Sequence, residues 1–263
     1  MGIEGAAVAT VISQFISMLW VLWFLTGRKA LLKIRMLNIK PEWNIVKKML
    51  GLGTAGFVMS ASNGVVQVAC NTTVKAFGGD IFVGVMTVVN SVRDTAFLPM
   101  HGIGNATQPV IGYNYGAGAF ERVKKSIRFL SVVSVLYMLL AWLLVLLFPE
   151  MFIRIFNDDP LLLEKGVGAL HTYFFGVFMM SMQVTGQSTF VGLGLSKQAV
   201  FFSLFRKVII VVPLTLLLPH VGGLGVQGVF LAEPISNFIG GTACYVTMLY
   251  TVRKMLGKEK IKH

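Results

Sequence analysis

Long apolar runs dominate the chain, and short polar or charged stretches separate them. The runs lie at about 6–26, 50–76, 81–112, 129–149, 167–195, 199–219 and 224–252. A helix needs about 20 apolar residues to cross the hydrocarbon core of a bilayer, and each run reaches that length. Because backbone polar groups in lipid must be paired within the protein, we expect these runs to be helical. The pattern predicts an all-α polytopic membrane protein with about seven transmembrane helices.

The composition agrees with this class of protein. Hydrophobic residues make up 55% of the chain, charged residues only 13%, and the mean hydropathy is +0.75. A soluble domain of this length carries about twice that charged fraction. The composition therefore excludes an ordinary soluble globular domain, and the lipid bilayer becomes the first expected partner.

The basic residues are grouped in alternate loops. The net charge is +12, and most lysines and arginines fall within 28–48, 122–128, 197–207 and 253–262. The intervening loop at 150–165 mixes both signs. Since cytoplasmic loops of membrane proteins are enriched in Lys and Arg, the four basic clusters predict cytoplasmic loops. The N-terminus is then outside and the C-terminus cytoplasmic, in a multi-pass protein of the plasma membrane. This placement explains the positive charge without a nucleic-acid partner.

The two ends of the chain resemble each other. Residues 2–17 read GIEGAAVATVISQFIS and residues 225–240 read GVQGVFLAEPISNFIG. Both helices run from outside to inside, and an even number of helices separates them, so we interpret the match as a parallel repeat of a six-helix unit. Under this interpretation five helices should precede Met1. A chance match between two Gly/Ala/Ile-rich helices is the alternative.

The repeat predicts four parts of the chain. Residues 1–26 form the last helix of a first bundle, and 27–43 form a cytoplasmic linker between bundles. Residues 44–252 form a complete second six-helix bundle, and 253–263 form a cytoplasmic basic tail.

Polar residues gather on one face of several predicted helices. Helical spacing aligns Ser60, Asn63 and Gln67 in one run, and Asn90 and Asp94 in the next. Polar faces of membrane helices point to a cavity or to one another. Hydrogen bonding between helices is therefore the alternative to a solute cavity for any single residue. The substrate-cavity candidates are Asn63, Gln67, Asn90, Gln183, Gln187 and Met179, the last because Met suits a wall that adapts to different solutes.

Two carboxylates within the apolar runs are candidates for binding a coupling ion. Asp94 and Glu233 each cost a few kcal/mol at the bilayer centre unless they have a function or a partner. Glu233 precedes Pro234, which frees a backbone carbonyl about one turn earlier and so offers a second oxygen to a cation. The alternative is a structural carboxylate paired with Arg93 across helices. Arg93 and Asp94 are adjacent, so we do not expect them to pair with each other.

A motif in the middle of the chain suggests a family. The stretch NATQPVIGYNYGAGAFERV, residues 105–123, is expected to end a helix at Gln108-Pro109 and to enter a cytoplasmic loop. It resembles the second-half signature of the multidrug and toxic compound extrusion family, through Gln108, Pro109, Gly112, Asn114, Tyr115 and Gly116. The GIEGAAVAT start and the AEPIS stretch are similar to the sixth and twelfth helices of that family.

The resemblance implies a fold and an activity. Members have two six-helix bundles around a central cleft and export organic, often cationic compounds against an inward flow of Na⁺ or H⁺. The implied partners are a small organic substrate and the first-half helices. The first bundle is missing here apart from one helix, so the chain is expected to be truncated.

Other chemistry is not indicated. No Walker motif is present, and the glycine pairs at 102–104 and 222–225 lack the strand–helix context of a nucleotide loop. Cys70 and Cys244 show no metal-ligand spacing, so we expect no metal, no cofactor and no enzymatic activity. The alternatives to an exporter are a flippase for lipid-linked saccharides on a related fold, or an inactive fragment. A flippase should line its cleft with several basic residues, whereas only Arg93 is expected inside a helix.

Overall fold

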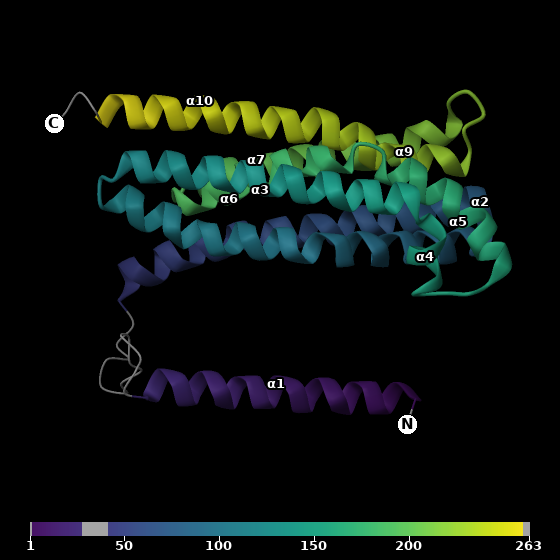
Figure 1. Cartoon of the computed structure of the whole chain (residues 1–263), viewed down its shortest axis with the longest axis horizontal. Helices are drawn as coiled ribbons and strands as arrows, with labels where there is room; N and C mark the ends of the chain where they lie inside the picture. Colours follow the sequence, from purple (N-terminus) through teal and green to yellow (C-terminus); the bar gives the residue numbers. More distant parts are fainter. Residues whose placement is uncertain (1, 28–41, 260–263) are drawn as a thin grey trace. The chain divides into compact units, whose positions relative to one another are not determined.

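The computed structural model describes residues 2–27 and 42–259, and within these ranges every regular element is helical (Figure 1). The chain divides into two compact units, Met1–Leu50 and Gly51–His263. Helix α1 spans Gly2–Thr26, as the first apolar run predicts. Most of the linker expected at 27–43 lies outside the described residues. The second unit begins at Gly51, slightly after the expected boundary at residue 44, although α2 already starts at Trp43.

Helix α2, Trp43–Gly116, contains two of the predicted segments. Its 74 residues would form a rod of roughly 110 Å, several times the thickness of a hydrocarbon core. Gly79 interrupts it with φ 70° and ψ −169°, a conformation that glycine tolerates and other residues rarely adopt. The break falls between the apolar runs expected at 50–76 and 81–112, so α2 is two consecutive helices rather than one.

The remaining helices follow the predicted runs with local interruptions. Their bounds are α3 Phe120–Leu147, α4 Pro149–Arg154, α5 Pro160–Phe174, η2 Val177–Met179, α6 Met180–Gly192, α7 Ser196–Leu204, η3 Phe205–Val211, α8 Val212–Leu217, η4 Leu218–His220, α9 Val226–Ser236, η5 Asn237–Gly241 and α10 Thr242–Glu259. Segments η3 and η5 are π-helical. Helix α10 includes residues 253–259, so this part of the expected tail continues the last helix.

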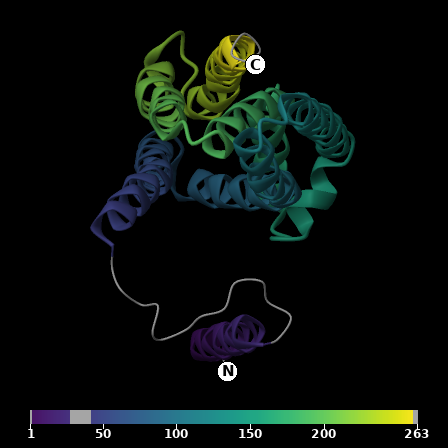
Figure 2. The ribbon, with the colours of Figure 1, turned by 90° about the vertical axis from the view of Figure 1, so that its left-hand side faces the viewer.

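The helices of the second unit form a bundle (Figure 2). Helix α6 packs against α3, α7 and α10, while α9 packs against α5 and α8 (Figure 1). Small residues permit close approach: a Cβ added at Gly186 on α6 would lie 2.6 Å from Cys244 Sγ on α10. Such contacts are typical of membrane helices, where small residues let backbones pack closely.

Several helices could cross a membrane. In the described part of the chain, four helices are long and apolar enough, or five if the bent pair α5 and η2–α6 is counted as one span. The bend of 41° lies at Gly176, which has a φ of 72°. The predicted segment at 224–252 is not among them, because polar residues such as Glu233 and Asn237 lower its hydropathy.

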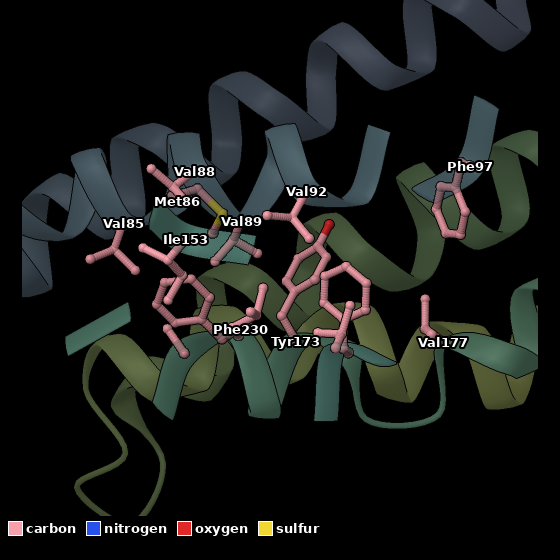
Figure 3. Close-up of a cluster of buried hydrophobic side chains, with 14 of the residues drawn as sticks. Val85, Met86, Val88, Val89, Val92, Phe97, Ile153, Tyr173, Val177 and Phe230 are labelled. Carbon is pink, nitrogen blue, oxygen red and sulfur yellow. The ribbon is translucent and has the colours of Figure 1, made fainter. Parts of the chain in front are cut away.

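One hydrophobic cluster supports the middle of the bundle. It joins valines of α2 to Ile153 of α4, Tyr173 of α5 and Phe230 of α9 (Figure 3). Figure 3 shows the Tyr173 ring among these apolar side chains, with its hydroxyl oxygen directed toward α2. The cluster thus fixes one polar atom at the edge of an apolar core, next to the charged residues described below.

Candidate functional site

A cavity of about 420 Å³ lies within the second unit. Its wall comes from α2, α5, α6, η3, α8 and α9, so segments far apart in the sequence contribute to one space. Apolar side chains such as Met86 and Phe97 alternate with amide and charged groups along this wall. The volume falls in the usual range for a small-molecule site, and the mixed lining is typical of one.

Most of the predicted amide face lies at this cavity. Asn63, Gln67, Asn90 and Gln187 all line it. Gln187 also donates from Nε2 to the carbonyl of Ala199 at 3.4 Å, so it additionally links α6 to α7. The first three come from the two halves of α2, which therefore supplies much of the polar wall.

The structure places the other two cavity candidates elsewhere. Gln183 is 1% exposed, and its Nε2 donates to the carbonyl of Phe202 at 3.3 Å. It thus links α6 to α7 and has no surface on the cavity. Met179 lies at η2, where its carbonyl would be 2.7 Å from a Cβ at Gly241. Met180, Val184 and Gln187 form the face of α6 that lines the cavity, and Gln183 lies at the edge of that face, turned toward α7. Helical spacing alone could not separate Gln183 from Gln187, because one turn of helix places them nearly in line.

A buried ion pair forms part of the wall. Arg206 Nη1 lies 2.8 Å from Glu233 Oε1, and the two side chains are 4% and 13% exposed. The same nitrogen donates to Asn237 Oδ1 at 3.0 Å and to Ser236 Oγ at 3.3 Å. The carboxylate is therefore paired, as one alternative proposed, but its partner is Arg206 and not Arg93.

Arg93 holds the other carboxylate of the cavity. Its Nη2 lies 2.8 Å from Asp94 Oδ1, and its Nη1 donates to the Tyr173 hydroxyl at 2.8 Å. The expectation that these neighbours would not pair is wrong, because the long Arg side chain folds back toward the next residue. The Asp94 side chain is 69% exposed and the Arg93 side chain 29%, so this pair is far more accessible than the pair at Glu233.

The third basic group at the cavity is Lys207. Its Nζ donates to the carbonyl of Met59 at 3.2 Å. The sequence interpretation assigned Arg206 and Lys207 to a cytoplasmic cluster, which the structure corrects: both lie inside a helical run that begins at Ser196 and both line the cavity. The available signal was their position well inside the apolar run at 199–219. The cavity therefore has three basic side chains in its wall and not Arg93 alone.

The family motif lies at the end of α2, away from the cavity. Gln108 and Pro109 do not end the helix, which continues to Gly116. Asn114 is buried, donates from Nδ2 to the Val110 carbonyl at 2.8 Å, and accepts at its own carbonyl from the Ala119 amide at 2.9 Å. Tyr115 packs toward Phe120, with ring centroids 6.2 Å apart.

Gly112 completes this part of the motif. A Cβ at this position would lie 2.9 Å from the Gly192 carbonyl oxygen on α6. The contact lets the end of α2 pack tightly against the end of α6. The motif residues thus shape the turn between α2 and α3 and its packing, and in the described chain none of the six belongs to the cavity wall.

The fold and cavity define a class of protein: a multi-pass helical membrane protein with a polar, solute-sized cavity inside its bundle. A family model described as MatE matches residues 56–217, and the chain belongs to that family, multidrug and toxic compound extrusion.

Individual relatives agree with this membership. A "Probable multidrug resistance protein NorM" of Thermotoga maritima is 31% identical over 186 residues, covering 70% of this chain and 39% of the relative. A "FAD transporter" of Shewanella oneidensis is 23% identical over 264 residues, covering 92% of this chain and 53% of the relative. The solved structure of an outward-facing multidrug resistance MATE transporter superposes with a TM-score of 0.91 at 21% identity, covering 98% of this chain and 58% of that one. The chain therefore spans about half the length of the relatives that it matches.

Proposed function

We propose that the chain acts in ion-coupled export of small organic compounds across the plasma membrane, with the cavity of the second unit as part of the solute path. The observation that carries the proposal is the cavity itself: about 420 Å³, lined by amides, apolar side chains and charged groups within a bundle of this family. A bundle held together only by packing has no need of such a wall. The N-terminus is proposed to be outside and the C-terminus cytoplasmic.

The coupling ion, Na⁺ or H⁺, is proposed to act at Asp94 and not at Glu233. Glu233 is nearly enclosed and bound by Arg206, so a cation or proton would first have to displace a buried ion pair. Asp94 is paired with Arg93, and its exposed carboxylate can exchange that partner for an ion. Access and a replaceable counter-charge are the two properties that a coupling carboxylate requires.

The charge of the exported compound is a separate question. The family resemblance implied often-cationic substrates, while the relatives' names include both a multidrug resistance protein and a FAD transporter. Three basic and two acidic side chains line the cavity, which does not favour a cation. Several basic residues were also the feature expected of a flippase for lipid-linked saccharides, but the MatE match favours the exporter.

Transport by the reconstituted chain tests the proposal. Proteoliposomes containing the 263-residue chain would be loaded with fluorescent organic dyes of positive, neutral and negative charge, and an inward Na⁺ or H⁺ gradient imposed. We expect gradient-dependent loss of at least one dye, abolished by an ionophore that collapses the gradient. Equal leakage from protein-free liposomes, with no response to either gradient, would contradict ion-coupled export.

A further inference from the structure

We propose that Lys207 binds an anionic group of the organic substrate, a carboxylate or a phosphate, inside the cavity of the second unit. This inference rests on the proposed transport function and specifies its substrate class. It depends on three observations: the pairing of the charges in the wall, the position of Lys207, and the donors that surround it.

Both carboxylates of the cavity are already paired. Glu233 is bound by Arg206 at 2.8 Å, and Asp94 is bound by Arg93 at 2.8 Å. Arg206 gains further acceptors in Asn237 and Ser236. Each arginine thus has its own carboxylate, and among the charged groups of the wall the ammonium of Lys207 is left without one.

Lys207 has a half-buried position from which its charge reaches the cavity. Within the described residues no carboxylate forms an ion pair with its Nζ, which donates a hydrogen bond to the Met59 carbonyl at 3.2 Å. An ammonium has three donors, so the carbonyl leaves two available. Withdrawing such a charge from bulk water is costly unless an opposite charge or several acceptors replace the water. An anionic ligand would provide that compensation.

The remaining donors suit an anion with an apolar body. The amide groups of Asn63, Gln67 and Asn90 can each donate to anionic oxygens, and they lie on the same wall. Met86 and Phe97 offer apolar surface for the rest of the molecule. An organic cation would have to displace an arginine from its carboxylate and would be repelled by Lys207, so the wall selects against it as well as for an anion.

Two matched dyes test the inference directly. The first is a small coumarin carrying a carboxylate, and the second is the same coumarin with a quaternary ammonium in that position. Equilibrium binding of each to the purified chain in detergent would be followed by fluorescence anisotropy. We expect the carboxylate dye to bind at least about tenfold more tightly, the ratio that a charge-assisted hydrogen bond provides. Tighter binding of the ammonium dye would overturn the proposal without use of any variant.

Variants then assign the effect to one residue. Lys207→Met should weaken binding of the carboxylate dye by about tenfold and leave the ammonium dye unchanged or stronger, whereas Lys207→Arg should retain most of the affinity. Lys197→Met is the matched control, because Lys197 is exposed near the start of the same helical run and does not line the cavity. Unchanged carboxylate binding in a folded Lys207→Met chain would overturn the role of Lys207.

The two proposals can fail separately. Gradient-driven transport of the ammonium dye alone would uphold ion-coupled export and overturn the anionic preference. Selective, Lys207-dependent binding of the carboxylate dye, with no gradient-driven transport of any dye, would uphold the anion site and contradict the export function.

Discussion

The Arg206 guanidinium lies 2.8 Å from the Glu233 carboxylate and joins two π-helical segments, since it belongs to η3 and also donates to Asn237 of η5. Gly240 of η5 makes room for it: a Cβ there would lie 2.6 Å from Arg206 Cγ. Irregular helical turns of this kind are frequent at functional sites. One arginine therefore neutralises the buried acid and also fixes the relative position of two irregular helices.

Breaking this ion pair should destabilise the bundle strongly. Glu233→Gln or Arg206→Met alone leaves one buried charge without its partner, a loss of about 3–5 kcal/mol in the free energy of unfolding. The double variant removes both charges and should lose clearly less than the two single losses together. Denaturant unfolding of the detergent-solubilised variants measures this double-mutant cycle.

A surface pair provides the control for that cycle. Glu121 and Lys124 are 2.9 Å apart, but their side chains are 67% and 46% exposed. Exposed pairs contribute roughly 0–1 kcal/mol, so the same cycle on Glu121→Gln and Lys124→Met should give a small coupling. Equal couplings at the buried and exposed sites would contradict the role given to Arg206.

Neutralising Asp94 should separate coupling from stability. In Asp94→Asn the exposed carboxylate is lost, but Arg93 keeps the Tyr173 hydroxyl as an acceptor and contact with water. We expect normal expression and a loss in unfolding free energy of about 1 kcal/mol or less, as for exposed pairs. Gradient-driven transport should fall at least tenfold, while dye binding is retained. Unchanged dependence of transport on the gradient, in a well-expressed variant, would place coupling at another residue.

The helices could be predicted because each follows from a local property of the chain. A run of about 20 apolar residues is readable without knowing its neighbours. The break at Gly79 falls between two of the predicted runs, 50–76 and 81–112. The bend at Gly176, by contrast, lies inside the predicted run 167–195, where only backbone geometry identifies it.

The pairing of the charges could not be predicted because it depends on tertiary contacts. The prediction grouped Arg206 and Lys207 with the basic flank at Lys197, although they lie in η3 within the helical run. Nothing in the sequence indicates that Arg206 faces Glu233, 27 residues away. Asn63, Gln67 and Asn90 lie at the cavity because their helical faces meet there, whereas Gln183 is turned to the Phe202 carbonyl of α7, a contact that the sequence does not indicate.

A methyl group at Gly112 should disturb the packing of the family motif. Gly112→Ala puts a Cβ 2.9 Å from the backbone oxygen of Gly192, which cannot move without shifting α6. We expect a loss of about 1–3 kcal/mol in the free energy of unfolding. Gly102→Ala, on the same helix but with no atom within 4 Å of the added Cβ, should be neutral or stabilising by up to about 1 kcal/mol. Similar unfolding midpoints for both variants would contradict the close-contact interpretation.

The proposed orientation predicts which loops can be labelled from outside the cell. Asp158 is exposed in the stretch between α4 and α5, and Lys254 is exposed near the end of α10. The basic clusters predict that Lys254 is cytoplasmic and that Asp158 is outside.

Single cysteines at these two positions test the orientation. They would be introduced in a background where the natural free cysteines, Cys70 and Cys244, are replaced by alanine. On intact cells, a membrane-impermeant maleimide should modify Asp158→Cys and spare Lys254→Cys. Both should react after the membrane is permeabilised, which shows that each thiol is accessible. Labelling of Lys254→Cys alone on intact cells would reverse the proposed orientation of the chain.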